Sequence, residues 1–127
     1  MKQIVLISFM LLFAATISAQ KKPHCKSTTK KVMTYFEKKK YVEVNQLFSS
    51  SLQKTVSAEQ LGQIWESVCK KGGGFVSFGE ITETTYRSRP VNQVECQLKN
   101  EKQQMIINYT VDGEICGLFF QPISTQN

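Results

Sequence analysis

Residues 91–121, VNQVECQLKNEKQQMIINYTVDGEICGLFFQ, are the part of the chain that decides its fold. Apolar and polar residues alternate along three runs in this stretch, 91–98, 103–111 and 114–121, and such alternation is typical of half-buried β-strands. The dipeptide Asp112-Gly113 separates the last two runs. It is a strong signal for a two-residue hairpin, because both positions of that turn take positive φ. A second tight turn is expected at Asn100-Glu101.

The two turns predict which residues face each other in neighbouring strands. The Asp112-Gly113 turn places Tyr109 opposite Cys116, and it also sets Ile107 against Leu118 and Met105 against Phe120. The Asn100-Glu101 turn places Cys96 opposite Met105 and Val94 opposite Ile107. Both turns select one apolar face, made of Val94, Cys96, Leu98, Met105, Ile107, Tyr109, Cys116, Leu118 and Phe120. Agreement between two independent turns predicts a packed antiparallel sheet.

Upstream of the glycine run at 72–74 the periodicity is helical. The segment 25–38 has an apolar face, with its lysines on the opposite side, and a second short helical pattern covers 41–50. A third helix begins at Ser57, which forms a capping box with Gln60. Its apolar residues follow at helical spacing: Leu61, Ile64, Trp65 and Val68.

Between the glycines and the alternating runs, residues 75–85 are rich in β-branched and aromatic side chains and form a first strand. A bulge near Gly79 is expected there, because Val76 and Phe78 have the opposite parity to Ile81. The chain is therefore predicted to be α+β, with two to three N-terminal helices packed on a curved four-stranded antiparallel sheet.

The N-terminus is predicted to be a cleaved signal peptide, residues 1–19. Lys2 is followed by an apolar run of 14 residues, Ile4 to Ile17. A bilayer span needs about 20 apolar residues, so the run favours cleavage after Ala19 over an uncleaved anchor. The mature product, 20–127, is expected to be one secreted or periplasmic domain with its core at about 28–122. The protein is expected to contact a membrane only through the signal peptide that is cleaved.

Charge and composition exclude several classes of function. The chain has 16 Lys+Arg and 10 Asp+Glu, with eight of the lysines between positions 21 and 40. Arginine and aromatic residues do not alternate with these lysines, so they predict a solvated helix face and no nucleic-acid partner. The single histidine, His24, argues against metal sites and histidine-based catalysis. No cofactor, metal or catalytic residue is predicted.

The four cysteines are expected to include one disulfide, because the predicted compartment is oxidising. If the first and third helices form an antiparallel hairpin, Cys25 lies near Cys69, and these two are predicted to be bridged. Cys96 and Cys116 lie on strands with another strand between them, about 10 Å apart, which is too far for a bridge.

Two sets of residues are candidates for binding. Trp65 would line a small apolar pocket with Met105, Tyr109 and Phe120 if the sheet curves away from the helices; the alternative is that the four simply fill the core. On the outer face of the sheet, Ile106 lies opposite Phe119, with Ile115 nearby. This apolar patch suggests a protein partner or a homodimer through the sheet, unless the ends of the chain cover it.

The order of several motifs resembles the domain-of-unknown-function family 3887. They are an aromatic first helix with Phe36, then Leu47-Phe48, a helix with Glu59, Leu61 and Trp65, then Gly74-Phe75, and a closing Gly117-Leu118-Phe119-Phe120. The resemblance covers about 28–122. It implies a cone-shaped fold like that of nuclear transport factor 2, cystatin and ketosteroid isomerase. Domains of that shape often hold small apolar ligands in the cone and dimerise through the sheet.

The functional expectation is an exported, non-enzymatic domain that binds a small apolar ligand or a protein partner. The alternative is an isomerase- or dehydratase-type enzyme that uses a pocket in the cone, although the acid and tyrosine set of the isomerases has no counterpart here. A cystatin-like protease inhibitor is disfavoured, because the inhibitory Gln-x-Val-x-Gly loop is missing and the segment 93–96 lies in a strand.

Overall fold

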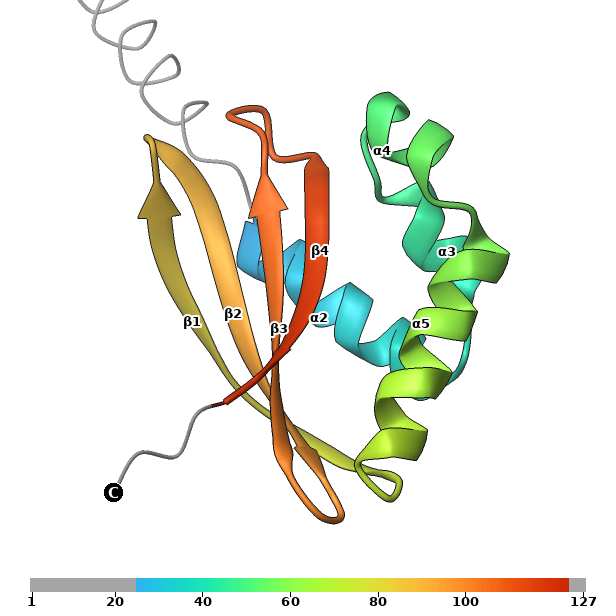
Figure 1. The fold of residues 1–127 in the computed structure, drawn as a ribbon. Helices are drawn as coiled ribbons and strands as arrows, with labels where there is room; N and C mark the ends of the chain where they lie inside the picture. The colour runs from blue at the N-terminus through green and yellow to red at the C-terminus, as the bar shows by residue number, and fades with distance from the viewer. Residues whose placement is uncertain (1–24, 124–127) are drawn as a thin grey trace, which may run out of the picture.

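The computed structural model describes residues 25–123, and in this part of the chain four helices precede four strands (Figure 1). The predicted signal peptide, residues 1–19, lies outside the described residues. The elements are α2 (Cys25–Glu37), α3 (Tyr41–Gln46), α4 (Ser50–Thr55), α5 (Ala58–Lys71), β1 (Phe75–Tyr86), β2 (Arg89–Leu98), β3 (Lys102–Tyr109) and β4 (Ile115–Pro122). The predicted α+β class is confirmed. No helix within 25–123 is long and apolar enough to cross a bilayer.

The start of α5 is the predicted capping box. The Ser57 hydroxyl accepts a hydrogen bond from Gln60 N at 3.1 Å, and the Gln60 side chain accepts one from Ser57 N at 3.0 Å. These two bonds satisfy amide groups that the first turn of a helix leaves without partners. The helix ends at Lys71 with Gly72 as its C-cap, and positive φ at Gly73 and Gly74 reverses the chain into β1.

The short helix predicted over 41–50 ends earlier in the structure, at Gln46, and a separate helix, α4, begins at Ser50. Phe48 leaves the helical path, is buried in the core and forms a parallel bridge with Ile115. The next residue, Ser49, is extended, and its hydroxyl accepts from Leu52 N to begin α4. This break depends on a contact with a distant strand, so local periodicity does not reveal it.

The sheet is antiparallel, with strand order β1-β2-β3-β4. The predicted pairs Ile107–Leu118 and Met105–Phe120 are confirmed. The pairing of Tyr109 with Cys116 is wrong, because the register shifts between Asn108 and Tyr109 and sets Tyr109 opposite Ile115. That shift also turns Ile115 inward. Its predicted place on the outer face is wrong, and its side chain is fully buried.

The turn between β2 and β3 differs from the prediction. Val94, not Cys96, lies opposite Met105. The turn is centred on Lys99 and Asn100, whose amides donate to Gly74 O at 2.9 Å and Gly72 O at 2.8 Å respectively. These bonds to the glycine run set the turn one residue earlier. The pairing changes by two residues along β2, so the same face of the sheet stays apolar.

The first strand has the predicted irregularity. Its register with β2 shifts between Phe78 and Ile81, which brackets Gly79, and it shifts again between Phe75 and Ser77. These bulges bend β1 so that Phe75 and Phe78 both pack on α5. The ring of Trp65 lies 5.3 Å from that of Phe75 and 5.7 Å from that of Phe78.

The predicted Cys25–Cys69 disulfide is absent from the structure, in which both thiols are free. Cys25 begins α2 at the sheet, where its carbonyl accepts from Tyr109. Burial raises the pKa of Cys69. The positive charge of Lys39, which follows the other end of α2, partly opposes this rise. At about 1.5 Å per residue, the 13 residues of α2 separate its ends by about 18 Å. Cys25 thus begins α2 at one end and Cys69 lies towards the other end, so the two helices do not form the hairpin that the predicted pairing assumed.

Candidate functional site

Three of the four predicted pocket residues are buried in the core, and the fourth, Phe120, is partly buried and packs against it. Trp65 is 3% exposed and its ring centroid is 5.5 Å from that of Phe120. Met105, fully buried, pairs with Phe120 across β3 and β4. Tyr109 is also fully buried, but it packs against the start of α2. The rings of Phe36, Phe75, Phe78 and Phe120 form an aromatic cluster around Trp65. Tyr109 lines a separate cavity of about 380 Å³ at the other end of the sheet face, with Cys116. A ligand pocket shared by the four residues stays a prediction and would require the aromatic cluster to open.

Tyr109 belongs to a chain of buried hydrogen bonds between the sheet and α2. The Asn92 amide donates to the Thr29 hydroxyl at 2.7 Å, and the Thr29 and Tyr109 hydroxyls are 2.6 Å apart. Tyr109 donates its proton to the carbonyl of Cys25 at 3.1 Å. Thr29 therefore donates to Tyr109 and accepts from Asn92. Every group in this network has a partner, so it holds the beginning of α2 on the sheet and is structural.

Burial makes two core groups poor acids. It raises the pKa of Tyr109 to about 12, partly opposed by the hydrogen bond from Thr29. It likewise raises the pKa of the Cys96 thiol to about 12, partly opposed by a hydrogen bond from the Met105 backbone. Both groups are neutral when protonated. Neither has an adjacent base, so they stay protonated at neutral pH and offer no nucleophile.

These shifts predict a loss of stability at alkaline pH. In the unfolded chain Cys96 and Tyr109 lose their protons near the ordinary values of 9.0 and 10.0, whereas in the folded chain they retain them to about 12. Their contribution is complete below pH 9 and is lost as the pH rises towards 12. We expect urea unfolding to give a constant free energy from pH 7 to 8 and a decreasing one above pH 9. The decrease should be shallower for Cys96→Ala; equal slopes would contradict the shifted pKa of Cys96.

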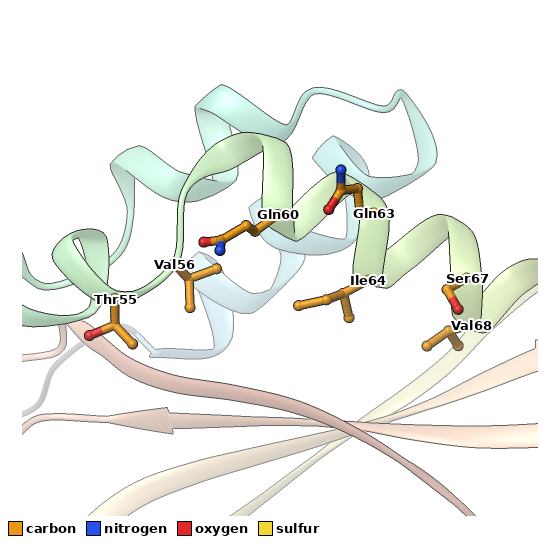
Figure 2. Close-up of a pocket in the computed structure, with 7 residues that line it drawn as sticks. All are labelled: Thr55, Val56, Gln60, Gln63, Ile64, Ser67 and Val68. Atoms are coloured by element: carbon orange, nitrogen blue, oxygen red, sulfur yellow. The ribbon is translucent and has the colours of Figure 1, made fainter.

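An open groove of about 510 Å³ runs along α5 and the turn before it (Figure 2). Its apolar lining residues are Val56, Ile64 and Val68. Uncharged polar side chains complete the lining: Thr55, Gln60, Gln63 and Ser67. Ile64 is 46% exposed, which is unusual for a large aliphatic side chain next to the buried Trp65. Figure 2 shows Val56, Ile64 and Val68 pointing from α5 and the turn before it towards the side of the sheet.

The groove arises because α5 buries only part of its apolar surface. Leu61 and Trp65 are one helical turn apart and face the core. Ile64 lies about 100° round the helix from Trp65, so it falls beside the buried stripe. Helical spacing alone predicts Ile64 and Val68 on the core stripe, and the exposure of Ile64 corrects this placement. One signal was present in the sequence: Gln60, Ile64 and Val68 form a flank without charge.

The outer face of the sheet carries the second predicted patch. Ile106 pairs with Phe119, as predicted, and Phe119 is 54% exposed. Three glutamine side chains form a ladder beside this pair: Gln121 donates to Gln104, and Gln104 donates to Gln93, each at 3.3 Å. The outer face of the sheet thus carries one apolar pair beside a row of side-chain amides. An interface with a partner or a second copy at this face stays a prediction.

Comparison with known families identifies the chain. Residues 29–118 match the family described as "Protein of unknown function (DUF3887)". The chain belongs to this family. Searches of curated proteins and of solved structures returned no match, and the cone-shaped fold like that of nuclear transport factor 2 stays a prediction. Because the function of DUF3887 is unknown, the function of this member is inferred from the geometry of its own residues.

The remaining chemistry of this DUF3887 member is limited. Within residues 25–123, histidine, cysteine and carboxylate side chains form no group of three or more that would hold a metal ion. The single salt bridge found in that range joins Lys102 and Glu95 at 3.0 Å on the exposed surface of the sheet. The α5 groove is therefore the feature that most needs a functional explanation.

Proposed function

We propose that this protein is an exported, non-enzymatic binding module whose α5 groove receives an uncharged, apolar segment of a partner protein. The observation that carries the proposal is the half-exposed Ile64 between Val56 and Val68, in a lining without a charged side chain. Exposed apolar surface of this kind marks interaction sites on soluble domains. Gln63, and the side-chain NH2 group of Gln60, whose oxygen accepts from Ser57 N, provide amide groups in the lining that suit the main chain of a peptide.

The shape of the groove favours a protein segment over a small apolar ligand. Sites for small ligands usually enclose about 70–90% of the ligand surface. The α5 groove is open to solvent, and its lining comes only from α5 and the turn before it. A partner protein would cover the groove from outside and so bury Ile64. A free small ligand would leave much of its own surface in water.

The lining also supports binding over catalysis. None of its seven side chains titrates, so it offers no general acid or base. An isomerase would need such a group at the reacting atom. The buried tyrosine, Tyr109, has its proton engaged by the carbonyl of Cys25 and lies outside the groove. The α5 groove therefore gives no support to the enzyme alternative.

The proposal is tested by selecting peptides against the mature protein. We expect random displayed peptides that survive selection to be uncharged and rich in aliphatic side chains. Ile64→Asp should weaken their binding at least tenfold, about 1.4 kcal/mol, because it places a charge on the apolar floor. The matched control is Val76→Asp, since Val76 is a 59% exposed valine on β1. Equal affinities for the two variants in calorimetric titration would refute the site.

A further inference from the structure

The outer edge of β4 is open beside the α5 groove. The backbone N–H of Ile123 donates to Lys102 O on β3 at 3.2 Å. Ile123 therefore directs its backbone groups towards β3. Because alternate residues of an antiparallel strand point their N–H and C=O groups to opposite sides, Gln121 and Phe119 also face β3. Leu118 and Phe120 therefore direct their N–H and C=O groups away from the sheet.

One end of this edge already accepts another segment of the chain. Ser49 donates to Ile115 O at 2.7 Å, and Phe48 forms a parallel bridge with Ile115. Within residues 25–123, no backbone hydrogen bond is found from another element to the outward groups of Leu118 or Phe120. The edge is thus paired at its beginning and unpaired along the following residues.

The two edges of the sheet differ in how they are protected. Natural edge strands are usually protected by charged side chains, bulges or proline. The edge strand β1 carries Glu80 and Glu83 and has two register shifts. β4, with the sequence ICGLFFQP, has no charged residue; its one register shift lies at its beginning, beside Ile115, and its proline lies at its end, so neither protects Leu118 or Phe120. An unprotected edge next to an apolar groove indicates that the edge is used for binding.

The β4 edge lies on the side of the sheet that faces α5, the helix that carries the groove (Figure 1). Trp65 on α5 and Phe120 on β4 have ring centroids 5.5 Å apart, and Ile64 is the neighbour of Trp65 along the helix. Contacts between α4 and β4 close one end of the space between them. Figure 1 shows β4 at the side of the sheet that faces α4 and α5. A strand added to β4 would direct every second side chain towards α5.

We propose that the partner segment binds by β-strand addition, as an uncharged extended peptide whose main chain pairs with Leu118 and Phe120. Its alternate aliphatic side chains contact Ile64, Val56 and Val68. This inference rests on the proposed function of the α5 groove and adds the mode of binding. Main-chain hydrogen bonds supply affinity in such complexes, and the side-chain contacts supply specificity. Pro122 has no N–H and therefore limits the length of the added strand.

A tethered peptide tests this mode before any partner is identified. The peptide Thr-Val-Thr-Val-Thr-Val-Thr is fused after Asn127 through a Gly/Ser linker of about 15 residues, which gives an effective concentration in the millimolar range. Amide hydrogen exchange at Leu118 and Phe120 is measured by NMR in the fused and unfused proteins. We expect at least tenfold slower exchange in the fusion. A fusion with proline in place of each valine should show no slowing.

The outcomes separate the binding mode from the proposed function. Slower exchange that returns to the unfused rate in an Ile64→Asp fusion supports both. If the peptide shifts the resonances of Ile64 and Val68 but exchange at Leu118 and Phe120 is unchanged, strand addition is wrong and the groove remains. If exchange is slow in the fusion and Ile64→Asp does not change it, strand addition is supported and binding in the α5 groove is wrong. Protection of these amides in the unfused protein that grows with its concentration would assign the edge to a second copy of the chain.

Discussion

Replacement of Trp65 by alanine is expected to lower the free energy of unfolding by about 4 kcal/mol. The indole is 3% exposed and lies at the centre of the aromatic cluster. Its ring centroid is 4.9 Å from that of Phe36 and 5.5 Å from that of Phe120, on opposite sides of the interface between helices and sheet. Alanine would leave a cavity that these surrounding rings fill only in part. The loss therefore exceeds the transfer free energy of the side chain alone.

The measurement is urea unfolding of Trp65→Ala beside Ile64→Ala. Ile64 is the preceding residue of the same helix and is 46% exposed, so its truncation should cost at most about 1 kcal/mol. A loss of about 4 kcal/mol corresponds to a thermal midpoint roughly 20 °C lower for a domain of this size. If both variants lose the same free energy, Trp65 does not join the helices to the sheet.

Gly72→Ala is expected to lower the free energy of unfolding by about 2–3 kcal/mol, in the range for overpacked cores. Gly72 has an ordinary φ of −86°, so backbone strain is not the cause. A Cβ at this position would lie 2.6 Å from the Cβ of the fully buried Leu98. The carbonyl of Gly72 also accepts from Asn100 at 2.8 Å. Any shift that relieves the clash therefore strains the bond that positions the β2–β3 turn.

A double-mutant cycle with Leu98→Ala isolates this contact. Each single variant should be destabilised, but the double variant should lose at least about 1 kcal/mol less than the sum of the two, because the shorter side chain makes room for the new Cβ. Gly79→Ala is the matched glycine control, since its nearest contact would be 3.3 Å from Glu95 Cβ. Additive losses in the cycle would contradict the close approach of Gly72 to Leu98.

The parts of the fold that were predictable depend on local chemistry. The alternation along 91–121 and the Asp112-Gly113 dipeptide are sufficient for three strands of the sheet, and the Ser57–Gln60 box fixes the start of α5. The errors arise from local irregularities and from contacts between distant segments. The register shift beside Tyr109 turns Ile115 inward, and the hydrogen bonds that Lys99 and Asn100 donate to the carbonyls of the glycine run set the turn at 99–100. Neither contact can be read from periodicity.

The candidate site was less predictable than the fold. Trp65, Met105 and Phe120 were correctly grouped on apolar faces, but whether such a group encloses a pocket depends on how closely the layers pack. Ile64 and Val68 fit the core stripe by spacing. Only the position of α5 relative to β4 leaves them beside a groove. The Cys25–Cys69 pairing failed for the same reason, because it assumed how two helices lie against each other.

The most direct test of groove binding is NMR chemical-shift mapping with the tightest selected peptide. The ¹⁵N-labelled mature protein is titrated, and the shifted amides are placed on the structure. We predict two adjacent clusters of shifts, one over residues 56–68 and one at Leu118 and Phe120. Shifts confined to the outer face of the sheet, around Ile106 and Phe119, would contradict the α5 groove as the binding site.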